Sequence, residues 1–355
     1  MRRRADPYAL PLEETSIAEL AQAAGYSTSF VGKWHLTSYT EGWESAPADH
    51  GFDWFAIAGG NLNITSLPVS TDYYFWERNE NGRVAYTETY ATRAQADDAV
   101  ARIQAMPEPW LLVLSFSAPH GPFHAPPPEL HTLGDLDGAG VPKLYRAAVE
   151  AVDTEIARVL DTLSAEQAEH TYVVFTADNG TPTEAVLSPI PRDQSKPSLT
   201  EGGLRVPLIL SGPGIQPGVS PALSGLVDLL PTFATWMDAP LQSPEGDPLV
   251  LDGIDLSPWL EDPSAPDSRD TLYAERFSTN GRPDDSEFYR RFIRGRRWKY
   301  GRDEVGREQL FDLADALYDT DELIGSGEED PQILDGMRST LDEVVTGRPY
   351  EYPGR

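Results

Sequence analysis

Cysteine is absent from this chain of 355 residues. Without a thiol the chain can form no disulfide, hold no thiolate metal site and use no thiol nucleophile. Any metal must therefore be bound through oxygen or imidazole ligands. Lysine is also scarce, because only four of the 28 Lys and Arg residues are lysines.

Long hydrophobic runs are absent too, since no stretch of 18 consecutive apolar residues occurs. Residues 1–7 include three arginines, but no apolar segment follows them as it does in a signal peptide. The sequence therefore predicts no membrane span, no signal peptide and a cytoplasmic location.

Positive charge is scarce, and 57 acidic residues against 28 basic ones give a net charge of -29. Such a chain repels phosphate backbones, which argues against a nucleic-acid partner. An acidic, lysine-poor surface also suits concentrated salt, although high-GC coding produces the same bias. A halophilic origin is thus one hypothesis. With 40% hydrophobic residues, 8 Trp, 15 Tyr and 12 Phe, the composition is that of a globular protein.

Apolar runs typical of buried strands alternate with helical patterns in the first part of the chain. The pattern predicts an α/β fold with a mostly parallel central sheet flanked by helices. The expected strands are 29–31, 110–116, 171–176 and 204–211, and the expected helices are 16–24, 91–106, 141–164 and 226–238.

The last part of the chain has a different pattern, which follows a Pro- and Asp-rich connection over residues 239–270. Short strands, including 288–295 and 298–300, precede a helix over 331–345. The sequence thus predicts a catalytic α/β domain over residues 1–265 and a small sheet-and-helix subdomain over residues 266–355.

Three of the expected strands are each followed by residues capable of catalysis or binding. These are GKWH at 32–35, Pro-His at 119–120 and Asp-Asn-Gly at 178–180. The carboxyl ends of strands carry the ligand site in open α/β sheets, so we expect one active site there. Two of the four lysines, Lys33 and Lys196, lie within or near such segments, where a compact point charge could face an anion.

Four segments resemble motifs of the sulfatases, in the alkaline phosphatase superfamily, and follow one another in that family's order. They are GYSTSFVGKWHL at 25–36, APHGPFHAP at 118–126, TADNG at 176–180 and KPSLTEGG at 196–203. RWKY at 297–300 and EQLFDL at 308–313 are similar to the family's C-terminal part. The resemblance implies an alkaline phosphatase-like fold and hydrolysis of a sulfate ester.

For the matching positions, the resemblance implies catalytic roles at Lys33, His35, His120 and Lys196. Lys33, His120 and Lys196 would bind the sulfate, whose spread negative charge needs fixed cations. His120 would also protonate the leaving alcohol, and His35 would act as a base on the nucleophile.

Asp178 and Asn179 offer one carboxylate and one amide oxygen, which suits Ca²⁺ or Mg²⁺. Without the other motifs, Asp-Asn-Gly would be read as an ordinary turn. Calcium takes six or more oxygens, so other groups must complete the site. The resemblance implies that the others come from an early pair of acidic residues and from the nucleophile.

The chain departs from the family in lacking that nucleophile. It has no Cys or Ser in a Cys/Ser-x-Pro-x-Arg segment, whose first residue becomes formylglycine in sulfatases, and no early strand with paired aspartates. Asp97 and Asp98 are the early acidic pair, but their helical surroundings predict a solvated face. We therefore expect an N-terminally truncated domain, inactive as it stands. An incomplete gene model, a real deletion or a complementing partner chain would each explain it.

Other histidines and aromatic residues carry no motif. His50, His131 and His170 are interpreted as structural or exposed, whereas His124 could line the substrate entrance or belong to a rigid loop. Aromatic residues before the second motif could bind sugars but fit a core better: Trp43, Trp54, Phe55, Tyr73, Tyr74 and Trp76.

The expected substrate is a small-molecule or carbohydrate sulfate ester. Hydrolysis of a phosphate or phosphonate monoester on the same fold is one alternative, and a non-catalytic relative that binds an anion or metal is another. The sequence does not determine the particular substrate or the oligomeric state.

Overall fold

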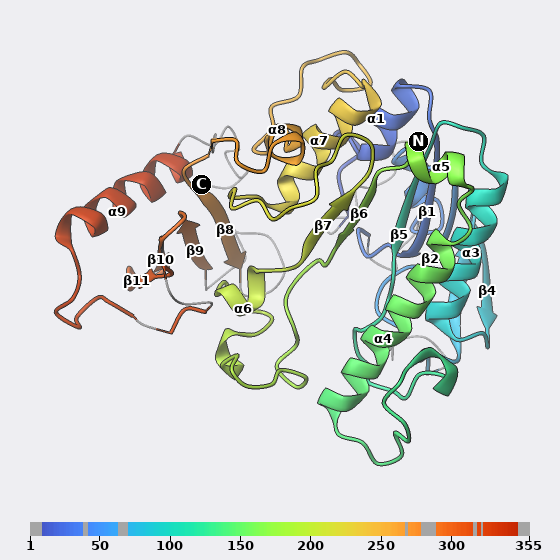
Figure 1. The fold of residues 1–355 in the computed structure, drawn as a ribbon, viewed down its shortest axis with the longest axis horizontal. Coiled ribbons are helices and arrows are strands. Elements are labelled where there is room, and N and C mark those ends of the chain that lie inside the picture. Colours follow the sequence, from blue (N-terminus) through green and yellow to red (C-terminus); the bar gives the residue numbers. More distant parts are fainter. Residues whose placement is uncertain are drawn as a thin grey trace. The chain divides into compact units, whose positions relative to one another are not determined.

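The computed structural model describes residues 9–37, 42–62, 70–266, 269–277, 289–314, 318–320 and 322–346. The chain divides into two compact units (Figure 1). Unit 1 combines Met1–Thr171 with Val227–Asp255, and unit 2 combines Tyr172–Leu226 with Leu256–Arg355.

Unit 1 is built on a five-stranded sheet with the order β4-β3-β2-β1-β5. Strand β1 lies parallel to both β2 and β5, whereas β3 and β4 are antiparallel to their neighbours. The strands are β1 (Ser27–Lys33), β2 (Trp54–Ala58), β3 (Trp76–Glu80), β4 (Arg83–Thr87) and β5 (Trp110–Ser115).

Helices cover both faces of this sheet. On one face, α1 (Ile17–Ala23) contributes Ala18 to a core with Phe30 and Phe55. On the other, α3 (Ala91–Ala105) and α4 (Val141–Leu160) pack Ile103 and Val159 against Leu112 of β5. The remaining elements of unit 1 are α2 (Ala46–Asp49), a 3-10 turn at Pro128–Leu130, α5 (Ala165–His170) and α7 (Leu229–Met237).

Helix α1 begins with a capping box, in which the Ser16 hydroxyl accepts from the Glu19 amide and the Glu19 carboxylate accepts from the Ser16 amide. A second capping box, between Ser164 and Gln167, starts α5. The prediction of a single helix over 141–164 is therefore wrong at its C-terminal end. Helix α4 ends at Leu160, and the Ser164 cap begins a separate helix.

Strands β2, β3 and β4 had no counterpart in the sequence prediction. Strands β3 and β4 form a hairpin in which Glu80 pairs with Arg83 across Asn81 and Gly82. Both turn residues have positive φ, 47° and 84°, as a two-residue type I′ turn requires. The Asn-Gly pair is thus the signal from which this hairpin could have been predicted.

Unit 2 contains two further sheets. In one, β6 (Val173–Thr176) pairs antiparallel with β7 (Leu208–Ser211). The other is antiparallel with the order β11-β10-β9-β8, and its strands are β8 (Leu272–Phe277), β9 (Tyr289–Arg294), β10 (Trp298–Asp303) and β11 (Glu308–Asp312). Helix α9 (Pro331–Thr346) buries Leu334 and Leu341 against Ile293 and Tyr300 of the four-stranded sheet. Shorter helices are the 3-10 turn Arg192–Gln194, α6 (Glu201–Leu204) and α8 (Ser257–Glu261).

The predicted fold class is confirmed, with a mixed central sheet flanked by helices and a separate antiparallel sheet and helix near the C-terminus. The strand expected over 171–176 is present as β6, but the structure pairs it with β7 in a separate sheet. The strand expected over 288–295 lies partly outside the described residues and is observed from Tyr289. None of the helices within the described ranges is long and apolar enough to cross a membrane.

Candidate active site

In unit 1, the first two motif segments leave the sheet at the ends of neighbouring parallel strands. Gly32 of β1 pairs with Ser115 of β5. Lys33 is the last residue of β1 and His35 follows it, while His120 follows the end of β5. The backbone turns at His35, which has a φ of 44°. The structure therefore brings the Lys33–His35 segment and the His120 loop to the same edge of one sheet. The sequence predicted the Asp178 segment at that edge too, but the strand before it, β6, pairs with β7 in a separate sheet.

Gly32 allows this close approach of β1 to β5. Its φ is 102°, a conformation that favours glycine, and a Cβ at this position would lie 1.9 Å from the Ser115 carbonyl oxygen. No other residue type fits there without moving the two strands apart. The glycine of the GKWH segment thus sets the spacing on which the lysine and both histidines depend.

The loop that carries His120 is clamped by two buried side chains. The Tyr73 hydroxyl lies 2.7 Å from the Ser117 carbonyl oxygen and 2.8 Å from that of His120. Gln95 holds Ser117 from α3, donating to its hydroxyl at 2.8 Å and accepting from its amide at 3.1 Å. The Nδ1 atom of His120 lies 2.8 Å from the Gly121 carbonyl oxygen, which favours the tautomer with a proton on Nδ1.

His124 belongs to the scaffold of this loop. Its ring stacks on Tyr73 at 3.9 Å, Nε2 lies 3.0 Å from the Tyr90 hydroxyl, and Nδ1 lies 2.9 Å from the Pro122 carbonyl oxygen. Burial lowers the pKa of His124, with an opposing effect from the Pro122 carbonyl. Between the two roles that the sequence left open, these contacts favour the rigid loop.

In unit 2, the Asp178–Asn179 turn lies beside the Lys196 segment. The Lys196 amide donates to the Thr181 carbonyl at 3.0 Å, and the Gly180 amide donates to the Gly203 carbonyl at 2.9 Å. A Cβ at Gly180 would lie 2.0 Å from the Gly202 carbonyl oxygen. The glycines of both motifs therefore serve close backbone packing, which brings the predicted metal ligands next to the predicted sulfate-binding lysine.

A complete cation site is not formed by the described residues. Asp178 and Asn179 supply two oxygen-bearing side chains, and the Asn179 amide nitrogen donates to the Gly180 carbonyl at 3.1 Å. Among the described residues, no group of three or more His, Cys, Asp or Glu side chains could hold a metal ion. Because Ca²⁺ takes six to eight oxygen ligands, these two hard oxygen donors suit the ion but supply only part of a site.

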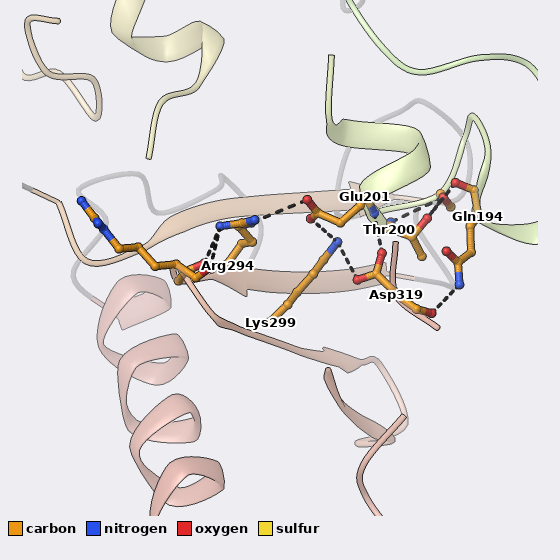
Figure 2. Close-up of polar contacts among 9 residues, drawn as sticks. Gln194, Thr200, Glu201, Arg294, Lys299 and Asp319 are labelled. Carbon is orange, nitrogen blue, oxygen red and sulfur yellow. Dashed lines mark hydrogen bonds and ion pairs between the residues drawn. The ribbon is translucent and has the colours of Figure 1, made fainter. Parts of the chain in front are cut away.

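A buried charge network that the sequence analysis missed holds the segment after Lys196. Lys299 of β10 is fully buried and lies 3.1 Å from a Glu201 oxygen and 3.0 Å from an Asp319 oxygen. Figure 2 shows Lys299 between these two carboxylates, with Arg294 on the far side of Glu201 at 3.6 Å. The Glu201 amide also donates to the Asp319 carboxylate. The scarcity of lysine was the signal, since Lys299 is one of the chain's four.

Of the early acidic pair, Asp97 is exposed as the sequence predicted, whereas Asp98 is partly buried. Asp98 of α3 receives two hydrogen bonds from Arg78, at 2.7 and 3.0 Å, and Asp97 lies 2.7 Å from Arg158. Burial raises the pKa of Asp98, and Arg78 opposes that rise. The prediction failed for Asp98 because its partner, Arg78, lies on another element, 20 residues away.

Most of the aromatic residues weighed as sugar-binding lie in the core, namely Trp43, Phe55, Tyr73 and Trp76. Tyr74 is exposed, and its hydroxyl donates to the Ala125 carbonyl at 2.6 Å. The half-buried Trp54 packs under the Arg102 guanidinium.

The histidines without a motif have structural or exposed positions, as expected. His50 is buried beside Trp34. The His131 Nδ1 accepts from the Leu133 amide at 3.3 Å, and the exposed His170 contacts its own helix.

The sulfatase family model matches residues 5–239. The chain belongs to the sulfatase family. Similar curated proteins include N-acetylgalactosamine-6-sulfatase of Canis lupus familiaris, 31% identical over 71% of this chain and 49% of that protein. Arylsulfatase A of Homo sapiens is 30% identical over 71% of this chain and 52% of its own length. The uncharacterized sulfatase YdeN of Escherichia coli is 29% identical over 71% and 48%.

Solved structures share the fold of this sulfatase chain. Ps i-CgsB in complex with k-i-k-neocarrahexaose has a TM-score of 0.72 at 23% identity, covering 96% of this chain and 76% of its own. BT4656 in complex with D-glucosamine-2-N,6-O-disulfate has a TM-score of 0.71 at 19% identity, with 96% and 84% covered. The chain spans about half the length of the curated relatives described above.

Proposed function

We propose that this chain forms part of a sulfuric ester hydrolase acting on a sulfated carbohydrate or a small aryl sulfate. Membership in the sulfatase family carries the proposal, and the convergence of Lys33, His35 and His120 at one sheet edge supports it. Relatives named for N-acetylgalactosamine 6-sulfate and a structure holding a glucosamine disulfate favour a carbohydrate ester.

The chemistry proposed for the chain's own residues follows from the charge of a sulfate ester. Lys33 and Lys196 would neutralise the sulfate oxygens, and His120 would bind the sulfate and give a proton to the leaving alcohol. His35 would take a proton from the nucleophile. In this proposal the nucleophile is a formylglycine that these 355 residues do not contain, so they alone would not hydrolyse the sulfate ester.

For the cation we propose a partial role. Asp178 and Asn179 would supply two of the oxygen ligands for Ca²⁺ or Mg²⁺, and the ion would add positive charge at the sulfate. The remaining ligands would come from outside the described residues.

Two alternatives are open to test. The missing nucleophile favours a non-catalytic relative that binds an anion without hydrolysing an ester. In the other alternative, a phosphate or phosphonate hydrolase of the same fold, a different nucleophile would act.

Calorimetric titration with inorganic sulfate and with 4-nitrophenyl sulfate tests binding, and release of 4-nitrophenol tests turnover. We expect both ligands to bind without turnover, and Lys196→Ala or His120→Ala to weaken binding at least tenfold. Lys143→Ala and His170→Ala are the matched controls and should bind as the unaltered chain does. Equal, small effects at all four positions would remove the assignment, and tighter binding of phosphate than of sulfate would favour phosphate ester chemistry.

A further inference from the structure

The charged side chains around Lys299 form a balanced set. Lys299 and Arg294 carry two positive charges, Glu201 and Asp319 two negative ones, and the side chains of Lys299 and Asp319 are both 0% exposed. A buried ammonium group is retained only where opposite charges and hydrogen bonds replace its water. Lys299 also lies over the Phe292 ring, with Nζ 5.5 Å from its centre.

Both carboxylates act on the start of α6. Glu201 is the first residue of that helix, and its amide donates to Asp319 while its carboxylate contacts Lys299. Gln194 joins the same network, because its side chain donates to the Asp319 carbonyl and its own carbonyl accepts from Thr200 at 2.8 Å. Figure 2 shows these contacts converging from the four-stranded sheet on the turn before α6.

The start of α6 in turn fixes the two candidate site segments of unit 2. Lys196 lies five residues before Glu201, in a segment whose turn is held by the contact between Ser198 and Thr200 at 2.5 Å. At the other end of α6, the Gly203 carbonyl accepts from Gly180, next to Asn179. A Cβ at Gly203 would lie 2.2 Å from the Ser198 carbonyl oxygen, so α6 and the segment after Lys196 pack closely here and only glycine fits.

We infer that Lys299 is a positioning residue, which holds Lys196 and the Asp178–Asn179 turn in place through Glu201 and Asp319. This inference rests on the proposed function for its consequence, because Lys196 is the group that would contact the sulfate. Lys299 itself is fully buried by its carboxylate partners and acts only through them.

The test compares Lys299→Met with Lys143→Met. The control removes the same charge from an exposed lysine, whose ammonium group donates to the Asp135 carbonyl. Hydrogen exchange of the amides of Gly180 and Lys196 reports the position of the two segments, and sulfate titration reports binding. We expect Lys299→Met to speed exchange of both amides at least tenfold and to raise the sulfate Kd at least tenfold. Lys143→Met should change neither.

Exchange along β9, β10 and β11 separates positioning from general loosening. If those strands exchange faster by the same factor as Gly180 and Lys196, or if the two amides are unchanged, the inference is overturned. A lowered melting temperature with an unchanged sulfate Kd also overturns it, since a purely structural role gives that result. If the unaltered chain binds no sulfate, the proposed function fails, while the exchange of the two amides still decides the positioning role.

Glu201→Gln serves where Lys299→Met does not fold. Glutamine keeps the shape and an oxygen acceptor for Lys299 but removes one charge, so the segments should loosen less. An intermediate rise in both exchange and sulfate Kd supports the inference, and no change in either opposes it.

Discussion

His124 shows how a single residue of a motif segment can serve the scaffold instead of the reaction. Its ring is stacked on Tyr73, and its two nitrogens contact the Tyr90 hydroxyl before α3 and the Pro122 carbonyl of the loop. Burial disfavours the charged form of this ring, because a protonated imidazole would lose solvation in this enclosed position. The loop that carries His120 is therefore coupled to the protonation of a histidine four residues away.

This coupling predicts a pH dependence of stability. Since burial lowers the pKa of His124 in the folded chain, the unfolded chain binds more protons near and just below the ordinary histidine pKa of 6.5. The free energy of unfolding should therefore rise from about pH 5 to about pH 7. In urea denaturation at several pH values, His124→Asn should flatten that rise, whereas the same change at the exposed His170 should leave it as it is. An unaltered slope in His124→Asn would contradict this account.

At the scale of elements, the contact between β1 and β5 determines where the unit 1 site forms. The two strands pair from Ser27 with Trp110 to Gly32 with Ser115, and the last pair has no room for a side chain. A change at Gly32 therefore acts on the position of two site segments at once.

We predict that Gly32→Ala is severely destabilising. Gly134 also has positive φ, 70°, but nothing lies within 4 Å of a Cβ built there, so Gly134→Ala carries the backbone cost alone, about 1–2 kcal/mol. Gly32→Ala adds a clash with the Ser115 carbonyl, and overpacking of this kind costs roughly 3 kcal/mol more. Urea denaturation of both variants measures the difference, and equal losses would mean that the strands yield without cost.

The sequence could predict elements whose signals are local. Strands β1 and β5 have a clear hydrophobic pattern, and the Lys33–His35 and His120 segments lie at the ends of these strands as predicted. Strand β3 reads WERNE, and its polar residues hid it from a search for apolar runs. Its hairpin was recognisable only by the Asn-Gly turn.

Contacts between distant segments could not be predicted in the same way. Glu201 and Lys299 are 98 residues apart, and Glu201 and Asp319 are 118 apart. No local pattern shows that a lysine in an aromatic strand will face two particular carboxylates. The Asp98 contact with Arg78 escaped prediction for the same reason.

At the scale of the whole molecule, the net charge of -29 sets the response to salt. Like charges on the surface repel one another in the folded chain more than in the expanded one. Raising the ionic strength from 0.1 to 1 M shortens the screening length from about 10 Å to about 3 Å and relieves this repulsion.

We therefore predict that the melting temperature rises between 0.1 and 1 M KCl, as the halophile hypothesis also requires. A neutral osmolyte such as sucrose at the same osmolality controls for exclusion from the surface, and it should give a smaller rise. A melting temperature that falls with KCl would mean that the ion pairs, such as Arg297 with Asp312, outweigh the repulsion.

The network around Lys299 also constrains how this sequence can change over evolutionary time. Its charges balance only as a set, and loss of one member leaves a buried charge without its partner. Substitutions at positions 201, 299 and 319 should therefore occur together in related chains. Lineages that replace Lys299 with a neutral residue should show compensating changes at both carboxylates.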